Sequence, residues 1–210
     1  MNIHSSFDYI LKLIIIGDSG VGKSNFVFRF MENRFSRAYQ TTVGVETKTK
    51  VCTLQKSKKN VKLQLWDTAG QEKYMSMCRL FFQKVQGIIL MYDITNRDSF
   101  DHLSKWIQII NDTTYNIPVV LVGNKIDDED DGRIVREEEG KAFAKDNGYL
   151  FYEASALNGK NVNNVIYNLC EIIISSLEIS FSMNNISQSY LDYFSIKEKK
   201  KFKLRKESCC

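Results

Sequence analysis

The sequence of 210 residues has little proline and little histidine: one proline, Pro118, and two histidines. A single proline excludes proline-rich linkers and polyproline ligands. His4 and His102 stand far apart without neighbouring metal ligands, so neither is expected to be catalytic or metal-binding. The longest apolar stretches, such as residues 117–122, fall far short of the roughly 20 residues that a membrane-spanning helix needs, so none is expected.

Cysteine is also scarce, and its pattern is irregular. Cys52, Cys78 and Cys170 are scattered, whereas Cys209 and Cys210 are adjacent at the end of the sequence. An odd number of cysteines without regular spacing predicts neither a disulfide framework nor a zinc site. The first residues show no basic start followed by a long apolar run, so we expect no secretory signal and a reducing, cytosolic compartment.

The net charge of +4 is unevenly distributed. Residues 197–207 contain seven basic and two acidic residues, a balance of +5, which leaves about −1 for the rest of the chain. A near-neutral body with a basic segment argues against nucleic-acid binding and indicates one local electrostatic role. The polar composition of residues 179–210 predicts a flexible tail.

Three near-continuous apolar runs, residues 11–17, 87–93 and 118–124, predict strands that are buried on both faces. Apolar residues recur at helical spacing in residues 100–110 and 162–177. Trp66 and Trp106 are expected to pack in the core. Strands that alternate with helices predict an α/β sandwich with helices on both faces of the sheet.

One strand has a different pattern. Residues 61–67 alternate between apolar and polar side chains, which is typical of a strand with one exposed face. We expect it to pair with residues 44–54 across a polar turn, as an antiparallel hairpin at one edge of the sheet.

Residues 17–24, GDSGVGKS, contain the pattern of Gly17, Gly22, Lys23 and Ser24 that cradles phosphates. The glycines let backbone N–H groups face phosphate oxygens, and the start of the following helix adds a positive dipole end. Lys23 can reach the terminal phosphates and Ser24 can offer a hydroxyl to magnesium. By itself this motif predicts a nucleoside triphosphate without choosing the base.

Residues 66–72, WDTAGQE, supply groups suited to the metal and to hydrolysis. Asp67 ends a strand, where its carboxylate can hold a magnesium-bound water. Gly70 can bring its N–H to the γ-phosphate, and Gln71 can orient an attacking water because its amide both donates and accepts hydrogen bonds.

Two further segments indicate guanine. In residues 124–127, NKID, the carboxylate of Asp127 can accept two N–H bonds from guanine that adenine cannot donate. Asn124 and Lys125 would brace the loop and cover the base. In residues 155–157, SAL, a backbone N–H could meet the guanine carbonyl.

These four motifs occur in order, and the chain resembles a Ras-superfamily small GTPase. The strings KLQLWDTAGQE and YDIT and the terminal Cys-Cys make it most similar to the Rab family. The resemblance implies a P-loop NTPase fold with a mostly parallel six-stranded sheet, one antiparallel edge strand and about five helices. It also implies a domain over residues 9–178, between an N-terminal extension, residues 1–8, and the tail.

The resemblance further implies a complete site. Residues 41–46 would form switch I, with Thr42 binding both magnesium and the γ-phosphate, and Phe35 would pack against guanine. The expected catalytic residues are Gln71, Lys23 and Thr42, and the expected magnesium ligands are Ser24, Thr42 and, through a water, Asp67. The expected nucleotide-binding residues are Ser19, Gly20, Val21, Gly22, Lys23, Ser24, Asn25, Phe35, Thr42, Gly70, Asn124, Lys125, Asp127, Ser155, Ala156 and Leu157.

By the same resemblance, Cys209 and Cys210 would each carry a geranylgeranyl group. Two lipid chains hold a protein stably on a membrane, and the basic run would add attraction to anionic lipid. The expected cofactors are GTP or GDP and Mg²⁺. The expected partners are an exchange factor, a GTPase-activating protein, a GDP-dissociation inhibitor, a prenylation escort and effectors. We expect a monomer that regulates vesicle traffic on the cytoplasmic face of an intracellular membrane, with a cytosolic pool.

The sequence departs from the family pattern at Thr47, where an aromatic residue is usual, at Leu157, and in residues 73–78 and 80–85. The departures at Thr47 and in residues 73–78 and 80–85 leave the choice of effectors and regulators open, whereas leucine at position 157 should still stack on the base. Three alternatives also remain: a metabolic P-loop kinase or ATPase, a scaffold that holds nucleotide without hydrolysing it, and a Ras- or Rho-type signalling protein.

Overall fold

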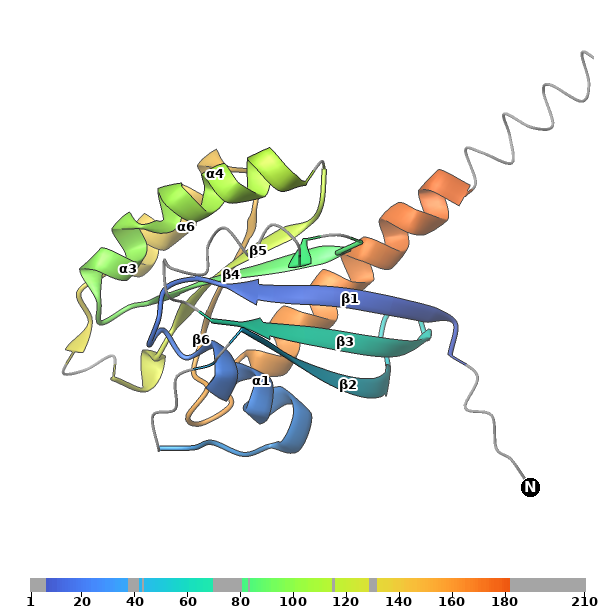
Figure 1. Cartoon of the computed structure of the whole chain (residues 1–210), viewed down its shortest axis with the longest axis horizontal. Coiled ribbons are helices and arrows are strands. Elements are labelled where there is room, and N and C mark those ends of the chain that lie inside the picture. Colours follow the sequence, from blue (N-terminus) through green and yellow to red (C-terminus); the bar gives the residue numbers. More distant parts are fainter. Residues whose placement is uncertain are drawn as a thin grey trace, which may run out of the picture. The chain divides into compact units, whose positions relative to one another are not determined.

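The computed structural model describes residues 7–37, 42, 44–69, 81–82, 84–114, 116–128 and 132–181 (Figure 1). Its contacts divide the chain into two compact units, residues 1–171 and 172–210. The sheet and the sites described below belong to the first unit. The predicted limits of the domain, residues 9–178, and of the tail, residues 179–210, stay predictions.

Six strands form one sheet, which confirms the predicted architecture. In spatial order they are β2 (Val45–Thr53), β3 (Asn60–Thr68), β1 (Tyr9–Ile16), β4 (Gly87–Asp93), β5 (Val119–Asn124) and β6 (Leu150–Ala154). The edge strand β2 is antiparallel to β3, and every other pair is parallel. The hairpin predicted from the alternating pattern is therefore confirmed, as are the three strands predicted from apolar runs.

The helices are α1 (Lys23–Glu32), α3 (Arg97–Asp101), α4 (Leu103–Thr113), α6 (Glu137–Asp146) and a helix over Val162–Phe181; the 3₁₀ turn η2 covers Ile126–Asp128. The helix predicted over residues 100–110 is interrupted at His102, which separates α3 from α4. The side chain of His102 leaves this turn to bond Asp18, a contact that helical periodicity cannot predict.

Both faces of the sheet are covered by helices, with α1 on one side and α3, α4 and α6 on the other (Figure 1). On β1, Ile14 and Ile16 belong to the apolar cluster formed with α3 and α4. Leu13 and Ile15, which point to the opposite face, are also fully buried. Burial of successive residues explains why these strands read as continuous apolar runs rather than as alternating ones.

The helix Val162–Phe181 is long and apolar enough to cross a membrane by length and composition alone. A helix buried in a protein core passes the same test. Val162, Val165, Ile166 and Leu169 are all buried, so core packing accounts for the apolar residues of its first half.

The carboxyl ends of the parallel strands meet at one edge of the sheet. The chain runs from β1 to β2 and β3 on one side of β1, then returns to β4 on the other side. In open α/β sheets ligands bind at such a reversal, outside the carboxyl ends of the strands. The backbone is tightest here at Gly17, which has φ 137°, and a Cβ at this position would lie 2.1 Å from the carbonyl oxygen of Met91.

Candidate functional site

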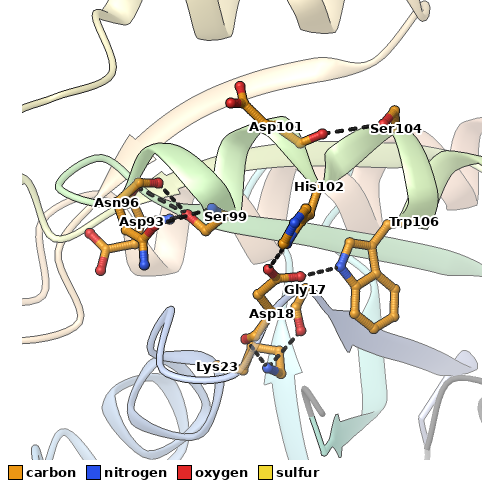
Figure 2. Close-up of polar contacts among 10 residues, drawn as sticks. All are labelled: Gly17, Asp18, Lys23, Asp93, Asn96, Ser99, Asp101, His102, Ser104 and Trp106. Carbon is orange, nitrogen blue, oxygen red and sulfur yellow. Dashed lines mark hydrogen bonds and ion pairs between the residues drawn. The ribbon is translucent and has the colours of Figure 1, made fainter. Parts of the chain in front are cut away.

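The loop between β1 and α1 is shaped to receive an anion. Gly22 caps α1 in a left-handed conformation without any side-chain cap, so the first N–H groups of the helix are left open to a ligand. Lys23, the first helical residue, is buried, and its Nζ donates to the carbonyls of Gly17 at 2.8 Å and Asp18 at 2.7 Å (Figure 2). A held ammonium beside an open helix N-terminus suits phosphate oxygens.

The buried amide of Asn124 joins this loop to the end of β5. Its Nδ2 donates to the carbonyl of Val21 at 2.8 Å, and its Oδ1 accepts from the N–H of Ala156 at 3.2 Å. A Cβ on Gly22 would lie 2.3 Å from that Nδ2, so only glycine leaves room for the contact. Three segments far apart in the sequence thus converge on one side chain, which has the bracing position expected for Asn124.

Asp127 is oriented by Ser155, a contact between two of the sequence motifs that neither motif shows by itself. The hydroxyl of Ser155 donates to Oδ1 of Asp127 and accepts from the N–H of Asn158 at 3.1 Å. Lys125 has φ 74°, and its Nζ forms an ion pair with the buried carboxylate of Asp93 at 2.5 Å. The loop therefore presents a fixed carboxylate beside a tethered lysine. Within residues 155–157, where a backbone N–H was expected to meet the base, the N–H of Ala156 donates to Asn124 in this structure.

Arg29 is a residue of this site that sequence reasoning missed. Its Nε donates to the carbonyl of Ala156 at 2.9 Å, and its Nη2 donates to that of Leu157. Its Nη1 donates to both the carbonyl and the side-chain oxygen of Asn33, each at 3.1 Å. One guanidinium therefore ties the end of α1 to the loop over residues 155–157. The sequence signal was an arginine between two phenylalanines, Phe28 and Phe30.

Ser24, Thr42 and Asp67 lie together, and their chemistry fits magnesium. The hydroxyls of Ser24 and Thr42 are 2.9 Å apart, and Asp67 is 3% exposed. Burial raises the pKa of the Asp67 carboxyl, while a hydrogen bond from Ser24 and the charge of Lys23 oppose the rise.

One oxygen of this carboxylate supports the same assignment. Oδ1 of Asp67 is buried and has no hydrogen-bond partner among the described residues. An orphaned buried oxygen is costly, and a cation with its bound water would satisfy it. The described part of the chain holds no group of three or more His, Cys, Asp or Glu side chains that could bind a metal ion by themselves. Two hydroxyls and one carboxylate suit Mg²⁺, which keeps several waters and binds through substrate phosphates.

Asn25, in the first turn of α1, holds the segment that follows this helix and contains Phe35. The side chain of Asn25 donates to the carbonyl of Ser36 and accepts from its N–H, both at 3.0 Å. These two bonds fix the backbone next to Phe35, which is half-buried. Ser19, Gly20 and Val21 lie in the loop between β1 and α1, and Leu157 is exposed. Gly70, Gln71, Cys209 and Cys210 lie outside the described residues.

Replacing Arg29 with methionine should speed the dissociation of a bound guanine nucleotide. Methionine keeps an unbranched stem beside Gly159 but removes the donors to Ala156 and Leu157. Losing about 1.4 kcal/mol of hydrogen bonding would make GDP release roughly tenfold faster. Release of a fluorescent GDP analogue measures this rate.

Arg97→Met is the matched control, because the guanidinium of Arg97 pairs with Asp101 and Glu139 on the surface. Its release rate should stay at the wild-type value. Equal rates in the Arg29 and Arg97 variants would show that Arg29 does not support the site.

Comparison with known proteins agrees with this geometry. The family model described as "Ras family" matches residues 12–175. Human Ras-related protein Rab-3D is 40% identical over 185 residues, which cover 88% of this chain and 83% of that protein. Human Rab-3A and bovine Rab-3C are each 42% identical over 176 residues, which cover 83% of this chain and 79% and 76% of those proteins. The chain belongs to the Ras family and is a Rab-type small GTPase, an enzyme that hydrolyses GTP.

Proposed function

We propose that this GTPase is a molecular switch that regulates vesicle traffic from the cytoplasmic face of an intracellular membrane. The observation that carries the nucleotide part of the proposal is the convergence on Asn124, which holds the phosphate loop and the base loop as one site. The similarity to Rab-3 proteins supports the trafficking role.

In this proposal the loop over residues 17–24 binds the phosphates. The N-terminus of α1 and Lys23 face the terminal phosphates, and Asp127 accepts two N–H bonds from guanine. Adenine, which lacks that donor pair, would leave the carboxylate unmatched. Magnesium, when bound, would neutralise charge on the phosphates, with Ser24, Thr42 and Asp67 holding it. The orphaned Oδ1 of Asp67 supports this assignment.

The switch would depend on contacts to the γ-phosphate. Thr42 and Gly70 would bind that phosphate and order the two segments that contain them, and hydrolysis would release both. Gln71 would orient the attacking water. The sequence offers no evident arginine finger, so intrinsic hydrolysis should be slow, on the order of 10⁻⁴ to 10⁻³ per second. An exchange factor and a GTPase-activating protein would then set the timing of the cycle.

Replacing Gln71 with leucine should slow single-turnover hydrolysis of bound GTP at least tenfold, because the attacking water loses its orienting amide. Affinity for GTP should not change, since Gln71 is assigned to the water rather than to the nucleotide. Phosphate release from preloaded protein measures the first quantity and calorimetry the second.

Gln108→Leu provides the control, because Gln108 is exposed on α4. Its hydrolysis rate should equal that of the wild type. A Gln71→Leu protein that hydrolyses GTP at the wild-type rate would remove Gln71 from the mechanism.

The membrane part of the proposal depends on the C-terminal residues. Cys209 and Cys210 would each receive a geranylgeranyl group, and a prenylation escort and a GDP-dissociation inhibitor would handle the lipidated protein. One lipid chain binds membranes only marginally, whereas two bind stably. The seven basic residues in 197–207 would add roughly 1 kcal/mol each near an anionic surface at most.

The double variant with serine at positions 209 and 210 should move from the membrane fraction to the cytosol without loss of GTP binding. Each single variant, with one lipid, should bind reversibly. Cell fractionation and the mass of the purified protein measure the two effects.

Cys52→Ser is the control, because the thiol of Cys52 is half-buried in β2. It should fractionate with membranes like the wild type. Membrane binding that survives loss of both terminal cysteines would overturn the proposed lipid anchor.

A further inference from the structure

The phosphate loop contains a carboxylate, Asp18, in a place where negative charge should oppose phosphate binding. Both of its oxygens are held from the α3–α4 region. Oδ2 lies 2.6 Å from Nδ1 of His102, and Oδ1 accepts from the indole N–H of Trp106 at 2.8 Å. Figure 2 shows the carboxylate pointing toward these two rings and away from the ammonium of Lys23.

The two donors are rigidly placed. They are four residues apart, so they share one face of the helical segment. Trp106 is 0% exposed and packs in the same apolar cluster as Leu103 and Leu90. The core therefore fixes the position of the indole N–H, because a fully buried ring cannot turn without repacking its neighbours.

His102 is held by the chain on both sides. Its N–H donates to the carbonyl of Asp98 at 2.9 Å, and its own carbonyl accepts from Lys105 at 3.0 Å. The preceding helix is fixed at its start, where the side chain of Asn96 accepts from the N–H of Ser99 (Figure 2). The interruption between α3 and α4 thus places an imidazole at the phosphate loop.

The backbone carbonyl of Asp18 makes a separate contact, with Lys23. Its carbonyl accepts from Nζ of Lys23 at 2.7 Å, beside the bond from the same ammonium to Gly17. Asp18 is therefore held through its side chain by His102 and Trp106, and its backbone carbonyl in turn holds Lys23. Movement of the Asp18 carboxylate would shift this carbonyl and bring its charge toward the phosphates.

We propose that His102 and Trp106 are positioning residues for phosphate binding. By holding Asp18 they keep its charge turned away from the phosphates and fix the peptide that holds Lys23. The inference rests on the phosphate-binding role proposed above. It connects α4 to the nucleotide through Asp18, although α4 contributes no residue to the four sequence motifs.

The test uses a double-mutant cycle with GDP as the probe. Trp106→Phe removes the indole N–H and keeps an aromatic ring, and His102→Leu removes the imidazole donor. Each should speed GDP release about fivefold to tenfold. His102→Asn, which keeps a side-chain N–H donor, should recover part of the wild-type rate. In an Asp18→Ala background, neither Trp106→Phe nor His102→Leu should change the rate further.

A second measurement separates a phosphate effect from general loosening. Affinity for GDP and for GMP is measured by competition with a fluorescent nucleotide. Because Lys23 acts on the terminal phosphates, Trp106→Phe and His102→Leu should weaken GDP more than GMP. Ser104→Ala is the control, because the Ser104 hydroxyl donates to Asp101 in the same helical turn. It should leave both affinities unchanged.

The outcomes are distinguishable. Effects that persist in the Asp18→Ala background, or that weaken GDP and GMP equally, would show that the two residues act through packing and would overturn the inference. The side chain of His102 is 41% exposed, so its substitutions test the inference even if Trp106→Phe disturbs the core. A wild-type protein that binds no GDP would instead contradict the proposed function.

Discussion

The site depends on one buried amide, that of Asn124, because it bonds two loops that are far apart in the sequence. It donates to the loop after β1 and accepts from the loop after β6. Gly22 makes the approach possible by having no side chain, and burial makes each of these bonds costly to lose. The two loops to which we assign phosphate binding and base binding are therefore joined through one side chain.

Around that amide the protein gathers charges at the carboxyl edge of the sheet. Lys23 and Asp93 are buried and partnered, the first by backbone carbonyls and the second by Lys125. Asp67 is the contrast, because one of its oxygens lacks a partner among the described residues. Charged side chains that already have partners are typical of a preorganised site. The unpartnered oxygen of Asp67 is where a bound cation and its water would complete the hydrogen bonding.

Much of this could be predicted from sequence because the relevant signals are local. Apolar runs identified β1, β4 and β5, and the alternating pattern identified β3. The motif over residues 17–24 placed Lys23 at the start of a helix. In each case the signal lies in consecutive residues, or in a strand and the loop that directly follows it.

The contacts that could not be predicted from the sequence are long-range ones, made by residues that belong to no motif. Arg29 reaches residues that are 127 and 128 positions away, and His102 and Trp106 reach Asp18 across 84 and 88 positions. No spacing rule connects such pairs, because they meet only when the helices pack against the sheet: α1 carries Arg29, and the α3–α4 region carries His102 and Trp106. Helical periodicity also could not predict the interruption at His102, because the apolar residues on either side of it keep the spacing of one continuous helix.

The central claim is that these two joined loops recognise guanine together with its phosphates, and calorimetry on the purified protein tests it most directly. Titration with GTP and with ATP in the presence of magnesium should give tight binding of GTP and no measurable binding of ATP, because only guanine satisfies the carboxylate of Asp127. Equal affinity for the two triphosphates, or binding of neither, would contradict the account.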